Sequence, residues 1–61
     1  MMDVFQVLLA DMSREKDSLI GTLSDGNCKS FEQYRYVCGQ INGLQIATRE
    51  IMTLQKQAND N

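Results

Sequence analysis

The sequence predicts an all-α protein, a two-helix antiparallel hairpin with helices at about residues 3–24 and 31–57. Three observations lead to this prediction. Proline, which interrupts helices, is absent from the 61 residues. Apolar residues recur at alternating steps of three and four in both halves, which is the period of an amphipathic helix. One cluster of turn-forming residues, Ser24–Asn27, separates the halves. We therefore expect residues 1–61 to form a single helical-hairpin unit.

The first helix is predicted from an apolar stripe along one of its faces. The stripe consists of Phe5, Leu9, Met12, Leu19 and Leu23, and it is widened by Val4, Leu8 and Ile20. Lys16 fills the one remaining slot of the stripe. Asp3 places a carboxylate near the positive end of the helix dipole, where negative charge stabilises a helix.

The connection between the helices carries recognisable end signals. Gly26 can adopt the left-handed conformation that ends many helices. Ser30 has the side chain of an N-cap residue, and Gln33, three positions later, completes a capping-box pattern. Because the connection is short, the two helices are expected to lie side by side and antiparallel.

The second helix is predicted from a coiled-coil-like spacing. Its stripe consists of Tyr34, Val37, Ile41, Leu44, Thr48, Ile51, Gln55 and Ala58, and Phe31, Cys38, Ala47 and Leu54 flank it. This apolar arc is wider than one neighbouring helix can cover. We therefore expect the hairpin to be completed by oligomerisation or by docking on a partner.

Small residues recur every four positions on the second helix, at Gly39, Gly43 and Ala47. Each glycine costs about 1 kcal/mol of helix stability relative to alanine, so close packing is expected there. One explanation is that the first helix of the same chain packs on this ridge, with Leu8 and Met12 filling the groove. The other is that a helix of another protein docks there. The intramolecular explanation uses the nearest available helix.

Aromatic and basic residues are interleaved around the start of the second helix, at Lys29, Phe31, Tyr34, Arg35 and Tyr36. We interpret Phe31 and Tyr34 as a cap on the hydrophobic end of the hairpin, with Tyr36 at its rim. A second interpretation makes Tyr36 and Arg35 anchors of a protein interface, where both residue types are enriched. Stacking on single-stranded nucleic acid is a third, but two cations neutralise little phosphate.

The residue types needed for catalysis are sparse. Histidine, the commonest general base and metal ligand, is absent. Cys28 and Cys38 do not complete a zinc site, and we interpret them as reduced thiols. Asp11, Glu15 and Asp17 alternate with basic residues, as on a solvated helix surface. We expect no catalytic site, no cofactor and no metal.

The second helix carries the one family resemblance of the chain. The segment Phe31–Leu44, FEQYRYVCGQINGL, followed by Ala47 and by Glu50-Ile51, resembles short products encoded near virion structural genes of tailed bacteriophages. Asn42 stands where that motif has an arginine. The resemblance covers most of the chain and implies a small virion or assembly protein, without catalytic residues.

These observations predict a non-enzymatic structural or interaction protein. The favoured role is a small virion or assembly component of a tailed phage, assembled in the host cytoplasm. It would pack on a larger structural protein (portal, tail or capsid) or on itself. A homodimeric four-helix-bundle regulator of RNA or DNA and a small inhibitor of a host protein are the alternatives. A net charge of -2 and the lack of a long apolar run argue against nucleic-acid and membrane partners. The residues expected at helix-packing interfaces are Gly39, Gly43, Ala47, Tyr36, Ile41, Leu44, Ile51 and Met52.

Overall fold

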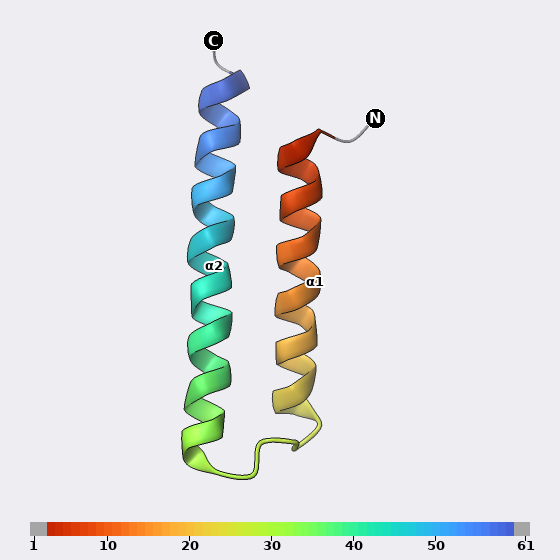
Figure 1. The fold of residues 1–61 in the computed structure, drawn as a ribbon, viewed down its shortest axis with the longest axis vertical. Coiled ribbons are helices and arrows are strands. Elements are labelled where there is room, and N and C mark those ends of the chain that lie inside the picture. The colour runs from red at the N-terminus through yellow and green to blue at the C-terminus, as the bar shows by residue number, and fades with distance from the viewer. Residues whose placement is uncertain (1–2, 60–61) are drawn as a thin grey trace.

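The computed structural model describes residues 3–59, and they form two helices, α1 (Val4–Ser24) and α2 (Phe31–Asn59). The helices run antiparallel and lie side by side, joined by one short connection (Figure 1). This confirms the all-α hairpin. The first helix ends where expected, and the second begins where expected but extends two residues further than predicted, to Asn59. A difference of this size is common at fraying helix ends.

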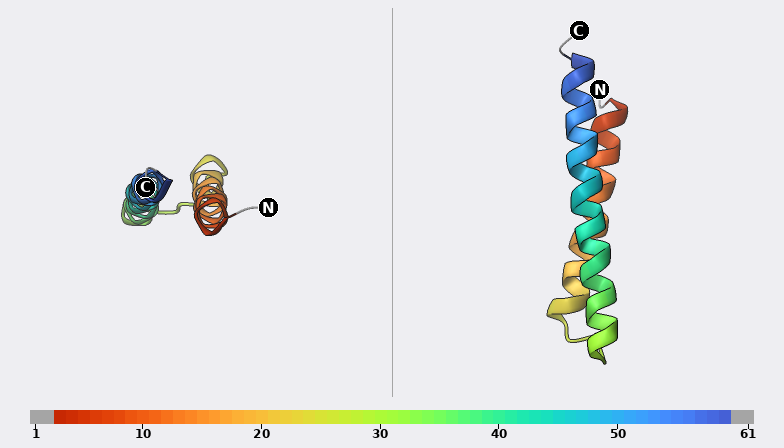
Figure 2. Two further views of the ribbon diagram at one scale, coloured as in Figure 1. Left: turned by 90° about the horizontal axis from the view of Figure 1, so that it is seen from above. Right: turned by 90° about the vertical axis from the view of Figure 1, so that its left-hand side faces the viewer.

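The hairpin is one layer thick. Its principal dimensions are 48 × 20 × 11 Å. The view along the helices shows α1 and α2 side by side, with nothing above or below them within the described residues (Figure 2). Stable domains ordinarily pack two or more layers around a shared core. Both broad faces of this hairpin are therefore open.

Capping interactions fix the start of α1. The backbone N–H of Gln6 donates to the Asp3 carboxylate at 2.8 Å, and the backbone N–H of Asp3 donates to the Gln6 side-chain oxygen at 2.9 Å. Two donors that the helix itself leaves unpaired are thus satisfied reciprocally. The sequence had indicated only the favourable charge of Asp3. In the structure Asp3 is the N-cap residue as well.

Backbone hydrogen bonds end α1 at the expected turn. The N–H of Asp25 donates to the Gly21 carbonyl at 2.9 Å, and the N–H of Asn27 donates to the Thr22 carbonyl at 3.3 Å. Gly26 lies between them with φ 71°, in the left-handed region that a side chain disfavours. The helix-ending role predicted for Gly26 is confirmed.

The start of α2 is capped by a variant of the expected arrangement. The Ser30 hydroxyl accepts from the Gln33 N–H at 3.1 Å, as an N-cap side chain does. The Gln33 side chain, however, accepts from the N–H of Lys29 at 2.7 Å rather than from that of Ser30. Gln33 therefore reaches one residue further back than the capping-box pattern predicts, and it ties the end of the connection to the helix.

The core is a single seam between the two helices. The seam consists of residues of the predicted stripes that lose much of their exposure; they are Phe5, Leu9, Met12, Lys16, Leu19 and Leu23 on α1, and Val37, Ile41, Leu44, Thr48, Ile51 and Gln55 on α2. Tyr34 and Ala58, the two ends of the stripe predicted for the second helix, are exposed instead. Among residues 3–59 only Val37 is fully buried, at 7% exposure. A seam between two helices covers each residue from one side, so the others stay half-exposed.

Removing the N-cap of α1 is expected to destabilise the hairpin measurably. Asp3→Ala leaves the Gln6 N–H without its partner, which typically costs about 1 kcal/mol. Thermal unfolding followed by circular dichroism measures the loss. Asp17→Ala is the matched control, because Asp17 is an exposed carboxylate in mid-helix. Equal melting of the two variants would contradict the capping role.

Candidate functional site

The structure divides the eight predicted interface residues between the seam and the surface. Ile41, Leu44 and Ile51 lie in the seam, and Ala47 is half-buried beside it. The remaining four, Gly39, Gly43, Tyr36 and Met52, are exposed. Half of the predicted set therefore lies at or beside the contact between α1 and α2, and the other half is exposed.

The intramolecular explanation of the glycine ridge is wrong. Gly39 and Gly43 are exposed, and a Cβ atom added at either position would meet nothing within 4 Å. At 100° per residue, Gly39 is rotated about 200° from Val37, which faces α1 in the seam. The glycines consequently point away from α1, and neither Leu8 nor Met12 packs on them. Docking of another protein on the ridge stays a prediction.

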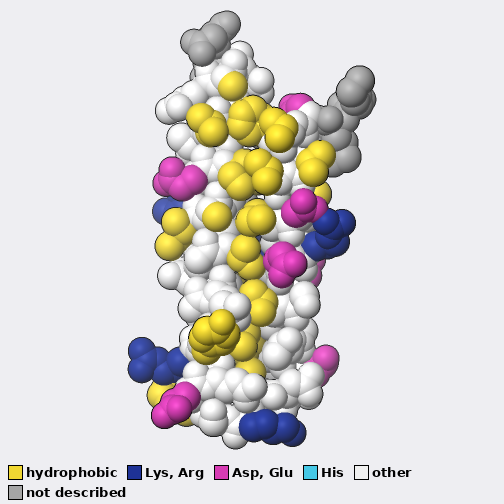
Figure 3. Space-filling view, viewed as in Figure 1, with side chains coloured by type: hydrophobic (Ala, Val, Ile, Leu, Met, Phe, Trp, Pro, Cys, Tyr) yellow, Lys and Arg dark blue, Asp and Glu magenta, His cyan; other side chains and the backbone are white. Residues whose placement is uncertain are grey.

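Helix geometry assigns the exposed apolar residues to two faces. In an antiparallel pair, the residues that precede seam positions lie on the same side of both helices. We call this side the front face; it is the side that Figure 3 shows. Tyr36 and Ala47 precede Val37 and Thr48, so they belong to the front face. Met52 follows Ile51 and belongs to the opposite, rear face.

Hydrophobic side chains gather on the front face at the end of the hairpin that carries the termini, and they spread across both helices there (Figure 3). We call this surface the open-end patch. It consists of Val4 and Leu8 of α1 and of Ala47, Ile51 and Leu54 of α2. Val4 is 66% exposed and Leu54 is 55% exposed. The sequence had shown Val4 and Leu8 as widening the stripe, but it did not indicate that Leu54 continues the same surface.

A shallow hollow borders the open-end patch on α2. It has a volume of about 320 Å³ and is lined by Glu50, Ile51, Thr53, Leu54 and Gln57. The lining comes from one helix and includes a single ionisable group, the Glu50 carboxylate. Small-molecule sites are usually concave and combine several convergent polar groups. This hollow therefore resembles the edge of a docking surface more than a ligand pocket.

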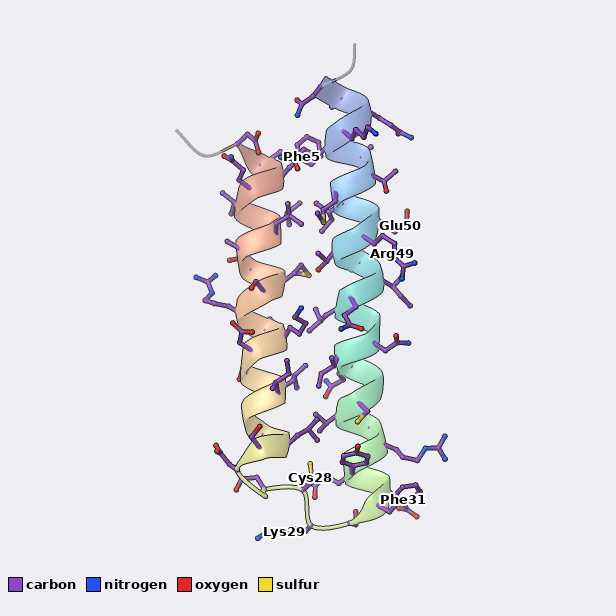
Figure 4. All side chains as sticks on the ribbon, turned by 180° about the vertical axis from the view of Figure 1, so that it is seen from behind. Phe5, Cys28, Lys29, Phe31, Arg49 and Glu50 are labelled. Atoms are coloured by element: carbon purple, nitrogen blue, oxygen red, sulfur yellow. The ribbon has the colours of Figure 1, made fainter. Side chains whose placement is uncertain are left out.

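An aromatic cluster occupies the other end of the hairpin, on α2. The rings of Phe31 and Tyr34 stack with centroids 6.4 Å apart, and the Arg35 guanidinium lies 6.0 Å from the Phe31 centroid. Phe31 is 71% exposed, and Tyr34 is exposed as well. The interpretation that these rings cap the hydrophobic end is therefore wrong, because they pack on each other and on Arg35 at the surface. Figure 4 shows Phe31 on the outer side of α2, next to the connection. Tyr36, expected at the rim, is exposed.

The two cysteines are free and half-buried. Cys38 lies beside the Tyr34 hydroxyl, and its interaction with that group, chiefly hydrogen bonding, raises the pKa of Tyr34 above 10.0. A higher pKa keeps the phenol neutral and protonated well above physiological pH.

The acidic residues of α1 form a solvated surface, as predicted. Arg14 pairs with the Asp11 carboxylate at the exposed side of the helix. Within residues 3–59 no group of three or more cysteine, aspartate or glutamate side chains is arranged to hold a metal ion. Neither described helix combines the length and the apolar character needed to cross a membrane.

No family model matches the chain, and no curated protein or solved structure was found to be similar to it.

Proposed function

We propose that this chain is a non-enzymatic interaction protein, a helical hairpin that completes its hydrophobic burial against another protein surface. The observation that carries this proposal is the exposure of large apolar side chains, Val4 and Leu54 among them, in a hairpin whose described part buries only Val37. Covering apolar surface contributes about 25 cal/mol per Å². A partner that binds the folded hairpin, and not the unfolded chain, therefore stabilises the folded state.

The distribution of charge supports a protein partner over nucleic acid. Six basic residues stand against eight acidic ones, and Arg14 is already paired with Asp11. Phosphate-backbone binding needs several uncompensated cations on one surface. The open-end patch, in contrast, offers only apolar side chains, which suits burial against another apolar surface.

The resemblance of Phe31–Ile51 to short tailed-phage products supports a narrower form of the proposal. In this form the chain is a small virion or assembly component, packed on a portal, tail or capsid protein or on a second copy of itself. The copy number would then follow the symmetry of the ring that carries it.

Quantitative mass spectrometry of purified virions tests this narrower role, using the phage whose genome encodes the chain. We expect the chain in the particles at a defined copy number relative to a ring-forming structural protein. Its absence from particles, combined with abundance in infected cells, would overturn the virion role and favour the regulator or the inhibitor. Whole-cell lysate from the same infection is the control for expression.

A further inference from the structure

The hairpin exposes more surface than a compact chain of its mass. Its accessible area is 4845 Å², whereas a compact monomer of 6.9 kDa exposes about 4,000 Å². The excess, roughly 800 Å², equals the area that each partner contributes to a standard protein interface. The flat shape, 11 Å in its smallest dimension, produces this excess. A second layer of similar length and width would remove it.

A two-fold axis can place the open-end patch against the same patch of a second copy. The patch crosses both helices at the same end of the hairpin, where the start of α1 lies beside the last turns of α2 (Figures 1 and 3). A two-fold axis that runs parallel to the helices, just outside this face, would bring α1 of one copy over α2 of the other. The α1 residues Val4 and Leu8 would then lie over the α2 residues Ala47 and Leu54 of the other copy. A surface shaped for an unrelated partner does not need this symmetry.

The four helices related by that axis form an ordinary bundle. Every neighbouring pair is antiparallel, which is the arrangement of up-down four-helix bundles with short loops. Gly43 lies on α2 one turn before Ala47 and carries no side chain, so it does not obstruct an opposing helix. The Ile51 side chain, half-buried in the seam, would join the seam of each hairpin to the new core.

Charge does not oppose this pairing. The seam sets Met12 beside Thr48 and Lys16 beside Leu44, so the front-face carboxylate of Asp11 lies level with Glu50 and that of Glu15 lies near the level of Gly43. In the same two-fold arrangement Glu15 would face a part of α2 without an acidic side chain, and Asp11 would lie at the edge of the paired faces, where its partner Arg14 offsets its charge. The Glu50 carboxylate of α2 is rotated about 140° from the middle of the seam, so it lies at the outer rim of the face and stays solvated.

We infer that the occupant of the open-end patch is a second copy of this chain, and that two hairpins pair through their front faces as a four-helix bundle. This inference rests on the proposed function, because it names the partner of the same apolar surface. It adds the symmetry of the assembly and the residues that meet across it.

Sedimentation equilibrium of the full 61-residue chain tests the pairing. We expect the mass to rise from 6.9 kDa toward twice that value with increasing concentration. Leu54→Lys should raise the dimer dissociation constant at least tenfold. Ile46→Lys is the matched control and should leave it unchanged, because Ile46 is comparably exposed on the same helix but points away from α1. A helical wild-type chain that stays monomeric, or a control that dissociates as readily as Leu54→Lys, would overturn the inference.

A variant that unfolds when it dissociates would leave the first test ambiguous. Mixing two different variants removes this ambiguity. Val4→Glu and Leu54→Lys should each weaken self-association. An equimolar mixture should form heterodimers, because the new glutamate of one chain lies opposite the new lysine of the other and the second contact stays native. Failure of the mixture to associate would contradict the geometry. The two proposals can fail separately. If the chain forms dimers but is missing from virions, only the phage role is refuted. If the chain is present in virions but monomeric in solution, only the pairing is refuted.

Discussion

Val37→Asp is expected to unfold the hairpin at room temperature. Val37 lies in the seam and is the one fully buried residue among those that the structure describes. A carboxylate there would lose its hydration without gaining a counter-charge, which costs several kcal/mol even when the group is protonated instead. At about 0.05–0.15 kcal/mol per residue, a chain of this length has only some 3–9 kcal/mol of stability to lose. Far-ultraviolet circular dichroism should show the helical signal largely gone.

Ile46→Asp separates burial from helix propensity. It introduces the same carboxylate into the same helix, at a position that stays solvated on the outer side. We expect it to cost no more than about 1 kcal/mol, because the substitution changes mainly helix propensity. Retention of a wild-type melting curve by Val37→Asp would show that the seam between α1 and α2 does not hold the hairpin together.

Periodicity predicts most of this fold, for a clear physical reason. The alternating steps of three and four identified the seam residues, from Phe5 on α1 to Ile51 on α2, because a helix buries whichever stripe is apolar. The end signals were equally local. Gly26 and Ser30 act through hydrogen bonds and dihedral angles within a few residues of themselves, so neighbouring sequence suffices to recognise them.

The candidate site was harder to predict than the fold. A small residue has no polar or apolar side chain to mark its side of the helix as exposed or buried. Gly39 and Gly43 carry no side chain whose polarity marks a face, so their spacing alone fitted either packing on α1 or exposure. Phe31 and Tyr34 were misplaced for a related reason. Burial at the end of a hairpin depends on where the connecting chain runs, which the local pattern does not contain.

The open-end patch was only partly visible in the sequence. Val4 and Leu8 broadened the stripe of the first helix beyond a coiled-coil seam, which correctly indicated surplus apolar surface. Leu54 broadened the apolar stripe of the second helix in the same way. What joins them is the antiparallel arrangement, which brings positions far apart in the chain to one side of the molecule. The composition of the patch could be predicted, but its continuity could not.

The double substitution Gly39→Ala with Gly43→Ala is expected to stabilise the isolated hairpin by about 2 kcal/mol. Each glycine in mid-helix costs about 1 kcal/mol relative to alanine, and the added Cβ atoms meet nothing within 4 Å. The thermal midpoint should therefore rise, together with helical content. Both are measured at the lowest concentration that gives a usable signal, because association raises the midpoint on its own.

Gly26→Ala is the matched control for this gain. It makes the same chemical change, but we expect it to lower the stability of the hairpin instead of raising it. At φ 71° an alanine is held in the left-handed region, which costs about 1–2 kcal/mol. A gain at positions 39 and 43 beside a loss at position 26 would show that the ridge glycines contribute nothing to the stability of the monomer. Gly39 and Gly43 would then reduce the stability of the helix without stabilising the hairpin. A loss of stability in the double variant would instead restore close packing of α1 on the ridge and remove this argument.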